Sequence, residues 1–278
     1  GELALDNTSN IAFVSQLEGG NDKYLFYKLL LRKYGVGFQS FRGQSYQRSS
    51  QLRNEEGIAL KFNKELNQFI SLELTFDFFR FPNVKYRSRY ATVGTERTLK
   101  VVFSKNKHEL STRLKWVRSS ENAVQQIEGS VGRYDIIKIT KMKSNIKYIF
   151  NVSKTAFIKS SLYINVHSEN SKASLGSALS VEISCQKENW NLRIGCAGIR
   201  ASNFDTRIYA YESTTQYSNP FVLLYGEGYS FFVKNTHSLK RNVRLSWKIE
   251  YREVRRKQGD VSALNRKVGA KVLFKYHF

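Results

Sequence analysis

The sequence predicts an all-β fold, an antiparallel transmembrane β-barrel of the outer-membrane type with about 14 strands, short periplasmic turns and longer extracellular loops. Three observations support this prediction. Apolar and polar residues alternate with a period of two in most segments, which is typical of strands with two different faces. Short polar turns alternate with longer links between these segments. Only 2 of the 278 residues are proline, which suits paired strands because proline cannot donate to a sheet ladder.

The alternating segments are the expected strands. Whether residues 2–6 also pair decides between about 13 and 14 strands, and the even number is the rule for bacterial barrels. Residues 24–34 also suit a short helix, because their apolar density is high. The apolar faces are, in chain order, Leu25/Tyr27/Leu29/Leu31, Ile58/Leu60/Phe62, Ile70/Leu72/Leu74/Phe76/Phe78, Leu99/Val101/Phe103, Leu110/Leu114/Trp116, Ile146/Tyr148/Phe150/Val152, Leu162/Ile164/Val166, Leu179/Val181/Ile183, Leu192/Ile194, Val243/Leu245/Trp247/Ile249/Tyr251 and Val268/Ala270/Val272/Phe274/Tyr276/Phe278.

The expected connections differ in length at the two ends of the strands. Tight polar turns are expected near residues 19–22, 65–67, 106–107, 154–156, 187–189 and 240–241. Longer links are expected at 35–55, 80–96, 119–133, 168–175, 201–227 and 255–266. Outer-membrane barrels have short periplasmic turns and long outer loops, so the long links are expected outside the cell.

The final segment, VGAKVLFKYHF, alternates strictly and resembles the closing strand of a bacterial outer-membrane barrel. Phe274, Tyr276 and Phe278 would then form the terminal signal for the barrel-assembly machinery. An amphipathic strand of a soluble sheet is the alternative for this segment taken alone. Residues 1–278 are expected to form one barrel domain, since no linker or composition break divides them.

The formal charge of +22 predicts contact with anionic partners. Clustered cations in the outer loops suit either the phosphates of lipopolysaccharide or a nucleic-acid backbone. Solvated or lipid-neutralising charge is the simpler of these interpretations. The candidates for polyanion or lipopolysaccharide binding are Arg80, Lys85, Arg87, Arg89, Arg97, Arg255, Arg256 and Lys257.

A second set of charged residues falls on the polar faces of the expected strands, which would line the lumen of a barrel. These side chains would either attract polyanions into a channel or pair with one another and fill the lumen. The lumen-lining candidates are Lys61, Glu73, Asp77, Arg113, Lys115, Lys147, Arg193, Arg244 and Lys248.

Four segments carry a resemblance to a known family: FFRFPNVKYR (Phe78–Arg87), DTRIYAYE (Asp205–Glu212), YGEGYSFF (Tyr225–Phe232) and NVRLSWKIEY (Asn242–Tyr251). They are similar to the carboxyl-terminal barrel of helix-hairpin-helix-containing outer-membrane proteins of Bacteroidota, whose amino-terminal modules are similar to those of competence DNA-binding proteins. The resemblance implies a membrane anchor for a nucleic-acid-handling, DNA uptake-like protein. Because no helix-hairpin-helix is present here, the chain is expected to be a fragment or a shortened member.

Catalysis finds little support in the sequence. The four histidines are scattered, no spacing suits a metal site, and no glycine-rich loop opens a helix. We therefore expect a porin-like channel or an anchor in the bacterial outer membrane, without enzyme activity, cofactor or metal. The alternative is a structural subunit of a larger outer-membrane complex. The expected partners are outer-membrane lipid and lipopolysaccharide, the barrel-assembly machinery, DNA and other outer-membrane proteins.

Cys185 and Cys196 are expected to remain free thiols on the apolar face. Pairing across the turn near residue 188 places Cys196 opposite about residue 181, which separates the two sulfurs by roughly 13 Å along the strand. A disulfide needs Cα atoms within about 7 Å.

Overall fold

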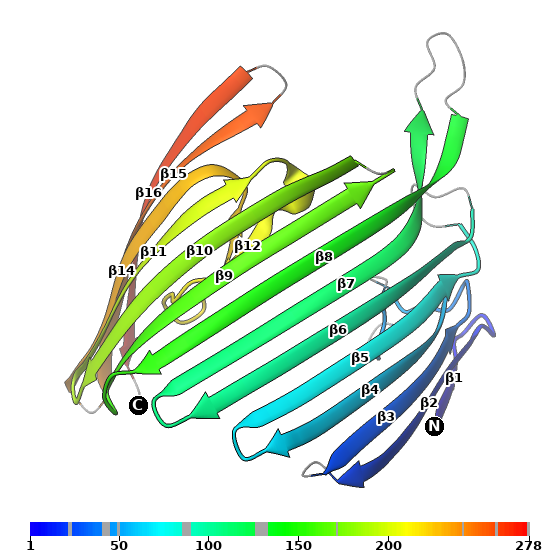
Figure 1. Cartoon of the computed structure of the whole chain (residues 1–278), viewed down its shortest axis with the longest axis horizontal. Coiled ribbons are helices and arrows are strands. Elements are labelled where there is room, and N and C mark those ends of the chain that lie inside the picture. The colour runs from blue at the N-terminus through cyan, green and yellow to red at the C-terminus, as the bar shows by residue number, and fades with distance from the viewer. Residues whose placement is uncertain are drawn as a thin grey trace. The chain divides into compact units, whose positions relative to one another are not determined.

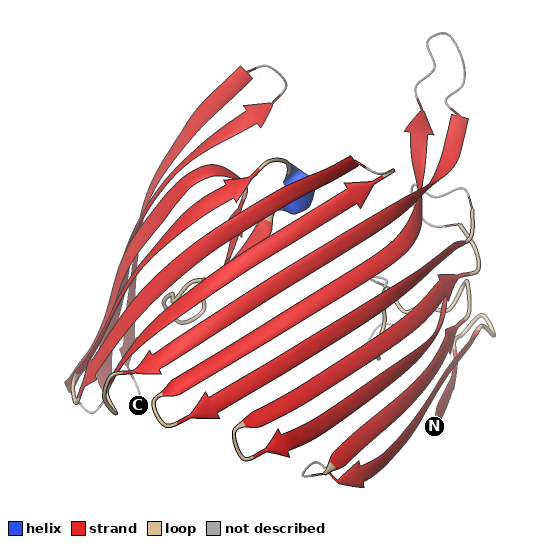
Figure 2. Cartoon of the chain, in the orientation of Figure 1, coloured by secondary structure: helices blue, strands red, loops and turns tan. Residues whose placement is uncertain are grey.

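The computed structural model is built almost entirely of strands (Figure 2). It describes residues 1–21, 24–40, 45–48, 51–84, 90–125, 133–170, 172–240, 242–258 and 261–276. Fourteen strands form one antiparallel sheet in the order β1 to β11, β14, β15 and β16, so neighbours in the sheet follow one another in the chain (Figure 1). The predicted antiparallel all-β fold with fourteen strands is confirmed.

The bounds of the elements are as follows. The main sheet contains β1 (Glu2–Leu5), β2 (Ile11–Asn21), β3 (Leu25–Tyr34), β4 (Glu55–Asn67), β5 (Ile70–Phe81), β6 (Thr92–Lys105), β7 (His108–Gln125), β8 (Arg133–Asn151), β9 (Ala156–Glu169), β10 (Lys172–Lys187), β11 (Trp190–Ala201), β14 (Gly226–Lys240), β15 (Val243–Gln258) and β16 (Val261–Tyr276). A separate two-stranded sheet contains β12 (Ile208–Tyr211) and β13 (Phe221–Leu224), preceded by the single helical turn η1 (Phe204–Thr206). Within the described residues, no helix has the length and apolar character needed to cross a membrane.

The chain divides into two compact units. The first contains residues 1–101, 114–142 and 168–172, and the second contains residues 102–113, 143–167 and 173–278. Each unit has its own set of charged contacts and is described by itself.

The first unit begins with the hairpin of β1 and β2, and the pairing of β1 brings the main sheet to fourteen strands. Strand β1 pairs with β2 from Glu2 opposite Val14 to Leu5 opposite Ile11. The Asp6 carboxylate closes the turn by accepting hydrogen bonds from the backbone N–H groups of Thr8 (2.9 Å) and Asn10 (2.8 Å). Desolvation, the largest single contribution, raises the pKa of Asp6, but the hydrogen bonds from Asn10 and Thr8 together outweigh it and lower this pKa to about 2. Residues 25–34 form the strand β3, so the alternative of a short helix is wrong.

Each unit presents one apolar and one polar face. In the first unit the apolar face includes Ile58 and Phe78, which lie opposite each other and are both 47% exposed. In the second unit the apolar face includes Leu179, Ile249 and Val272, which are also exposed. The alternate residues of the same strands carry paired charges. Large exposed apolar surfaces mark contact with a membrane or a partner, so the apolar faces require a partner of that kind.

The connections agree with the prediction at most positions and differ at three. The tight turns and the long links between β3 and β4, β5 and β6, and β11 and β14 lie where they were expected. The expected long links 168–175 and 255–266 are instead mostly strand, because β9 ends at Glu169, β10 begins at Lys172, and β15 and β16 stay paired as far as Gln258 opposite Val261. The expected link 119–133 is shorter than predicted, because β7 continues to Gln125 and β8 begins at Arg133. Backbone hydrogen bonds between paired strands continue through polar sequence that has no apolar face. A prediction from alternation alone therefore ends these strands too early.

Candidate functional site

A buried ion network occupies the polar face of the first unit. The Arg32 guanidinium contacts Glu55 (Nε to Oε1, 2.7 Å) and Asp77 (Nη1 to Oδ1, 2.8 Å), and all three side chains are fully buried. Gly57 makes room for Arg32, because a Cβ at this position would lie 2.5 Å from the guanidinium carbon. The predicted lumen residue Asp77 is therefore not a free anion but the counter-ion of a buried arginine.

The link between β3 and β4 folds over this network. Arg48 donates to Asp77 and binds Glu96 (Nη1 to Oε2, 2.7 Å). The ring of Tyr46 lies between two cations, with guanidinium carbons of Arg32 and Arg48 5.0 and 5.4 Å from its centroid. This link was expected to form an outer loop, and its described residues 45–48 lie on the polar face instead.

Burial of this link changes two acid–base equilibria. Desolvation first, and then the Asp77 carboxylate, raise the pKa of Tyr46 to about 12. Desolvation of Arg48 opposes its charged form, but the Asp77 and Glu96 carboxylates outweigh it and raise the pKa of this guanidinium. Tyr46 therefore stays neutral and Arg48 stays cationic across the physiological pH range.

The other predicted lumen residues of the first unit are also in ion pairs. Lys115 binds Glu96 (2.6 Å), and Lys61 binds Glu73 (3.1 Å) across neighbouring strands. Both lysines are about one-third exposed, so these pairs contribute little stability compared with the Arg32 network. They do reduce the free positive charge of this face.

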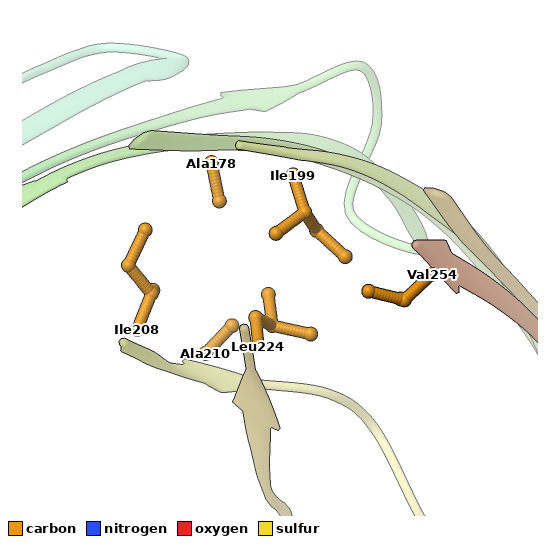
Figure 3. Packing of buried hydrophobic residues seen from close by; sticks show 6 residues of the cluster. All are labelled: Ala178, Ile199, Ile208, Ala210, Leu224 and Val254. Carbon is orange, nitrogen blue, oxygen red and sulfur yellow. The ribbon is translucent and has the colours of Figure 1, made fainter. Parts of the chain in front are cut away.

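In the second unit, the hairpin β12–β13 packs on the polar face of the strands around it. Figure 3 shows Ile208, Ala210 and Leu224 of the hairpin facing Ala178, Ile199 and Val254 of β10, β11 and β15. Each of these six side chains is at least 94% buried. Alternation explains the packing, because residues 208 and 210 lie on one face of the short strand β12. This hairpin holds residues 202–225 on the polar face, whereas the prediction was an outer loop.

The packed hairpin places the carboxylate of Glu212 beside the buried ammonium of Lys248. Glu212, at the end of β12, binds Lys248 of β15 (Oε2 to Nζ, 3.1 Å), and Glu250 binds the same ammonium at 2.9 Å. Arg252 approaches Glu212 at 3.6 Å. The Lys248 side chain is only 2% exposed, so it depends on these carboxylates for its charge balance.

The neighbouring Ser213 completes a second cluster. Its hydroxyl donates to Glu182 (2.8 Å) and accepts from Arg193 Nη1 (2.9 Å), while Lys159 binds Glu182 at 2.8 Å. Arg193 itself lies 3.5 Å from Glu182. Glu212 and Ser213, two successive residues, thus bind charged side chains on β10, β11 and β15.

A row of three lysines crosses the last three strands of this face. Lys234 of β14 lies opposite Lys248 of β15, and Lys248 lies opposite Lys271 of β16. Like charges directly opposite in a ladder are destabilising. Glu212 and Glu250 are the carboxylates that bind the middle lysine, so the hairpin segment supplies part of the neutralising charge.

The remaining predicted residues lie at separate places. Lys147 binds Glu109 (3.0 Å), and Arg244 lines a small polar pocket of about 270 Å³ at the tight-turn end of β11, β14 and β15. Arg113 lies on the exposed surface of β7. Arg255 and Arg256 belong to β15 rather than to a loop, and Arg256 stacks on the Tyr225 ring at 5.4 Å. Phe274 and Tyr276 are exposed on the apolar face.

Several predicted residues cannot be placed. Lys85, Arg87, Arg89 and Phe278 lie outside the described residues, as does the side chain of Lys257. The basic cluster predicted at 80–97 is thus described only at Arg80, which binds Glu56 (2.6 Å), and at Arg97.

Arg32 and Glu212, each at the centre of one of the two ion networks, were not among the predicted site residues. Arg32 falls on the face opposite Leu29 and Leu31, but residues 24–34 also suited a short helix, so no role was assigned to it. Glu212 ends DTRIYAYE, a segment noted only for its resemblance. The alternation of Ile208 and Ala210 was the available signal for a packed strand beyond the main sheet.

Comparison with known proteins gives likenesses in structure only. No protein-family model and no curated protein sequence matches the chain. The ferric yersiniabactin uptake receptor FyuA of Yersinia pestis is 9% identical, with a TM-score of 0.49 over 99% of this chain and 57% of the receptor. The siderophore receptor PirA of Acinetobacter baumannii is 11% identical, with a TM-score of 0.47 over 96% of this chain and 48% of the receptor. OmpT, an outer-membrane protein of Vibrio cholerae, is 9% identical, with a TM-score of 0.32 over 99% of this chain and its whole length.

The chain spans about half the length of the two receptors. At these identities no residue of the receptors is transferred to this chain, and the sites are argued from its own contacts. In the described part of the chain, no group of three or more His, Cys, Asp and Glu side chains is placed to hold a metal ion.

Proposed function

We propose that this chain forms the wall of a β-barrel in the bacterial outer membrane and serves as a membrane anchor with an obstructed lumen. The observation that carries the proposal is the division of the strands into an exposed apolar face and a polar face of paired charges. Outer-membrane strands alternate in this way, with apolar residues toward lipid and polar residues toward the lumen.

Strand length supports the same proposal. Strands β4 to β11 contain between 12 and 19 residues each. A tilted strand needs about 9–11 residues to cross the hydrocarbon core of a bilayer. Each strand is therefore long enough to cross and to extend beyond the membrane.

Two folded segments argue for an obstructed lumen. In a barrel the polar faces line the lumen, so residues 45–48 and the hairpin β12–β13 would lie inside it. Buried ion pairs hold both segments: Arg48 to Asp77 and Glu96, and Glu212 to Lys248. We expect a low single-channel conductance in planar bilayers, and large steady openings of the wild-type chain would contradict the anchor proposal.

A gated channel is the second candidate, favoured by the row Lys234, Lys248 and Lys271. Movement of the hairpin segment would expose this row to the lumen and select for anions. This candidate predicts rare, anion-selective openings, whereas the anchor predicts a steadily low conductance without them.

The nucleic-acid role rests on the family resemblance. Its direct test is DNA binding by the purified chain over a range of salt concentrations, since each phosphate contact adds about one unit to the slope of log K against log salt. An affinity without salt dependence would exclude phosphate contacts. A role as a subunit of a larger outer-membrane complex would appear as partners that remain bound during purification.

The membrane proposal is tested by spin labels at two adjacent positions of β16. Val272 is 73% exposed on the apolar face, and Lys271 lies opposite Lys248 on the polar face. In a background where Cys185 and Cys196 are replaced by serine, V272C in lipid vesicles should be accessible to oxygen, and K271C to a water-soluble nickel complex. Equal access of the nickel complex to both labels would show a soluble sheet.

A further inference from the structure

The first unit has a pocket on its apolar face that the ion networks do not use. It has a volume of about 830 Å³ and is lined by residues of β4 to β8. Figure 1 shows these five strands side by side. The apolar lining includes Ile58, Phe78 and Val93, of which Val93 is 60% exposed. The pocket lies near the long-link end of the strands, since Arg80 is followed by the last residue of β5 and Val93 is the second residue of β6.

The charge of this pocket is strongly positive. Its lining includes four basic side chains, Arg80, Arg97, Arg118 and Lys138, and one carboxylate, Glu56. Arg80 already binds that carboxylate through Nε and Nη2, both at 2.6 Å. Among the described side chains, none of the carboxylates lies within ion-pair distance of Arg97, Arg118 or Lys138. The pocket therefore combines an apolar floor with three cations that have no counter-ion among the described side chains.

A membrane makes this combination informative. Cations on the lipid face of a barrel are costly at the middle of the bilayer, and the cost nearly disappears at the interface. Arg97, Arg118 and Lys138 lie five to seven residues from the long-link ends of β6, β7 and β8, which have 14 to 19 residues. Because about 9–11 residues cross the hydrocarbon core, these positions suit the level of the headgroups. Arginine binds phosphate oxygens through a planar fork of donors, which makes it the preferred residue for phosphate recognition.

We propose that this pocket binds lipid A of the outer leaflet. Arg97, Arg118 and Lys138 bind its sugar phosphates, and Ile58, Phe78 and Val93 contact an acyl chain. Lipid A fits better than a glycerophospholipid because its two phosphates are separated on a disaccharide, and the three cations are spread over three strands. This inference rests on the proposed function, since only a chain in the outer membrane meets this lipid.

The test compares two triple variants of the full chain, purified in detergent and titrated with bis-phosphorylated hexa-acyl lipid A. The pocket variant is R97Q/R118Q/K138Q. The control variant, K64Q/K105Q/K154Q, removes the same charge from exposed positions at or near the tight-turn ends of the strands. We expect the pocket variant to lose about tenfold or more in affinity, because charged hydrogen bonds are lost, and the control to stay within about twofold.

Two further ligands show which chemical group of the lipid the pocket recognises. Lipid A without its phosphates should bind the wild-type chain as weakly as lipid A binds the pocket variant, and phosphatidylglycerol should bind the two chains alike. Equal losses in both triple variants would overturn the proposal in favour of nonspecific charge. Selective loss of phosphatidylglycerol binding in the pocket variant would overturn it in favour of a glycerophospholipid site.

The spin labels at positions 271 and 272 separate the two proposals. If the labels show insertion and the pocket variant binds lipid A normally, the lipid site is wrong and the membrane anchor stands. If the labels show a soluble sheet, the membrane proposal is wrong, and the lipid A site that rests on it is wrong as well.

Discussion

Replacing Glu212 by glutamine should loosen the hairpin segment from the polar face of the second unit. The substitution keeps the shape of the side chain and removes its charge. Lys248 then loses the carboxylate at 3.1 Å and keeps Glu250 at 2.9 Å, while Arg252 loses its partner at 3.6 Å. The middle lysine of the row consequently has one counter-ion instead of two.

The size of the effect follows from burial. Lys248 is 2% exposed and Glu212 is 9% exposed, so water cannot replace the lost carboxylate. Breaking a fully buried pair costs about 3–5 kcal/mol, and a charged hydrogen bond contributes about 1.5–3 kcal/mol. Because Glu250 remains, we expect a loss of about 2–3 kcal/mol in the free energy of unfolding, near the lower of these ranges.

A double-mutant cycle with K248M isolates this pair. The four chains are unfolded with urea in lipid vesicles and followed by tryptophan fluorescence, since Trp190 and Trp247 lie in the second unit. The expected coupling energy is about 1.5–3 kcal/mol. Trypsin should also cleave E212Q after Arg207 faster than it cleaves the wild-type chain. A coupling energy below about 0.5 kcal/mol, with unchanged cleavage, would refute the role given to Glu212.

Three other predictions follow from the contacts. Arg32→Met removes the buried guanidinium that binds Glu55 and leaves Asp77 with Arg48 as its remaining arginine partner, so it should cost about 3–5 kcal/mol in urea unfolding, against at most about 1 kcal/mol for the exposed control Lys61→Met. Because the folded pKa of Tyr46 is about 12 and its ordinary value is 10.0, stability should fall as pH rises between these values, and Tyr46→Phe should abolish that part of the loss. Cys185 and Cys196 should both be alkylated after unfolding without reductant, and a mass two hydrogens lower without alkylation would show a bridge.

The parts of the fold that alternation determines could be predicted from sequence. Residues 70–78 and 243–251 are strands as expected, because a period of two depends only on neighbouring residues. The same reasoning set the register across a tight turn. Val181 lies opposite Cys196, as predicted, and both cysteines are free.

The parts that depend on distant partners could not be predicted. The alternation of Ile208 and Ala210 indicates a strand, but no local pattern says that it packs on Ile199 or that Glu212 then contacts Lys248. The length of links was also overestimated where hydrogen-bonded pairing continues into polar sequence, as for Gln258 opposite Val261. Pairing of the lumen candidates with carboxylates was expected from sequence, and Lys61 binds Glu73 and Lys248 binds Glu250 in this way. The additional partner Glu212 could be identified only from the structure.

The row of lysines also constrains the order in which the end of the chain assembles. Strands β14, β15 and β16 follow the hairpin segment in the chain and are joined by short connections, so they can pair rapidly with one another. If they pair before residues 202–225 are in place, Lys248 is enclosed between Lys234 and Lys271 without Glu212. If the hairpin docks first, Glu212 supplies the carboxylate that Lys248 would otherwise lack. The hairpin on the polar face would then also assist assembly, and deleting residues 202–225 should slow folding of the last three strands.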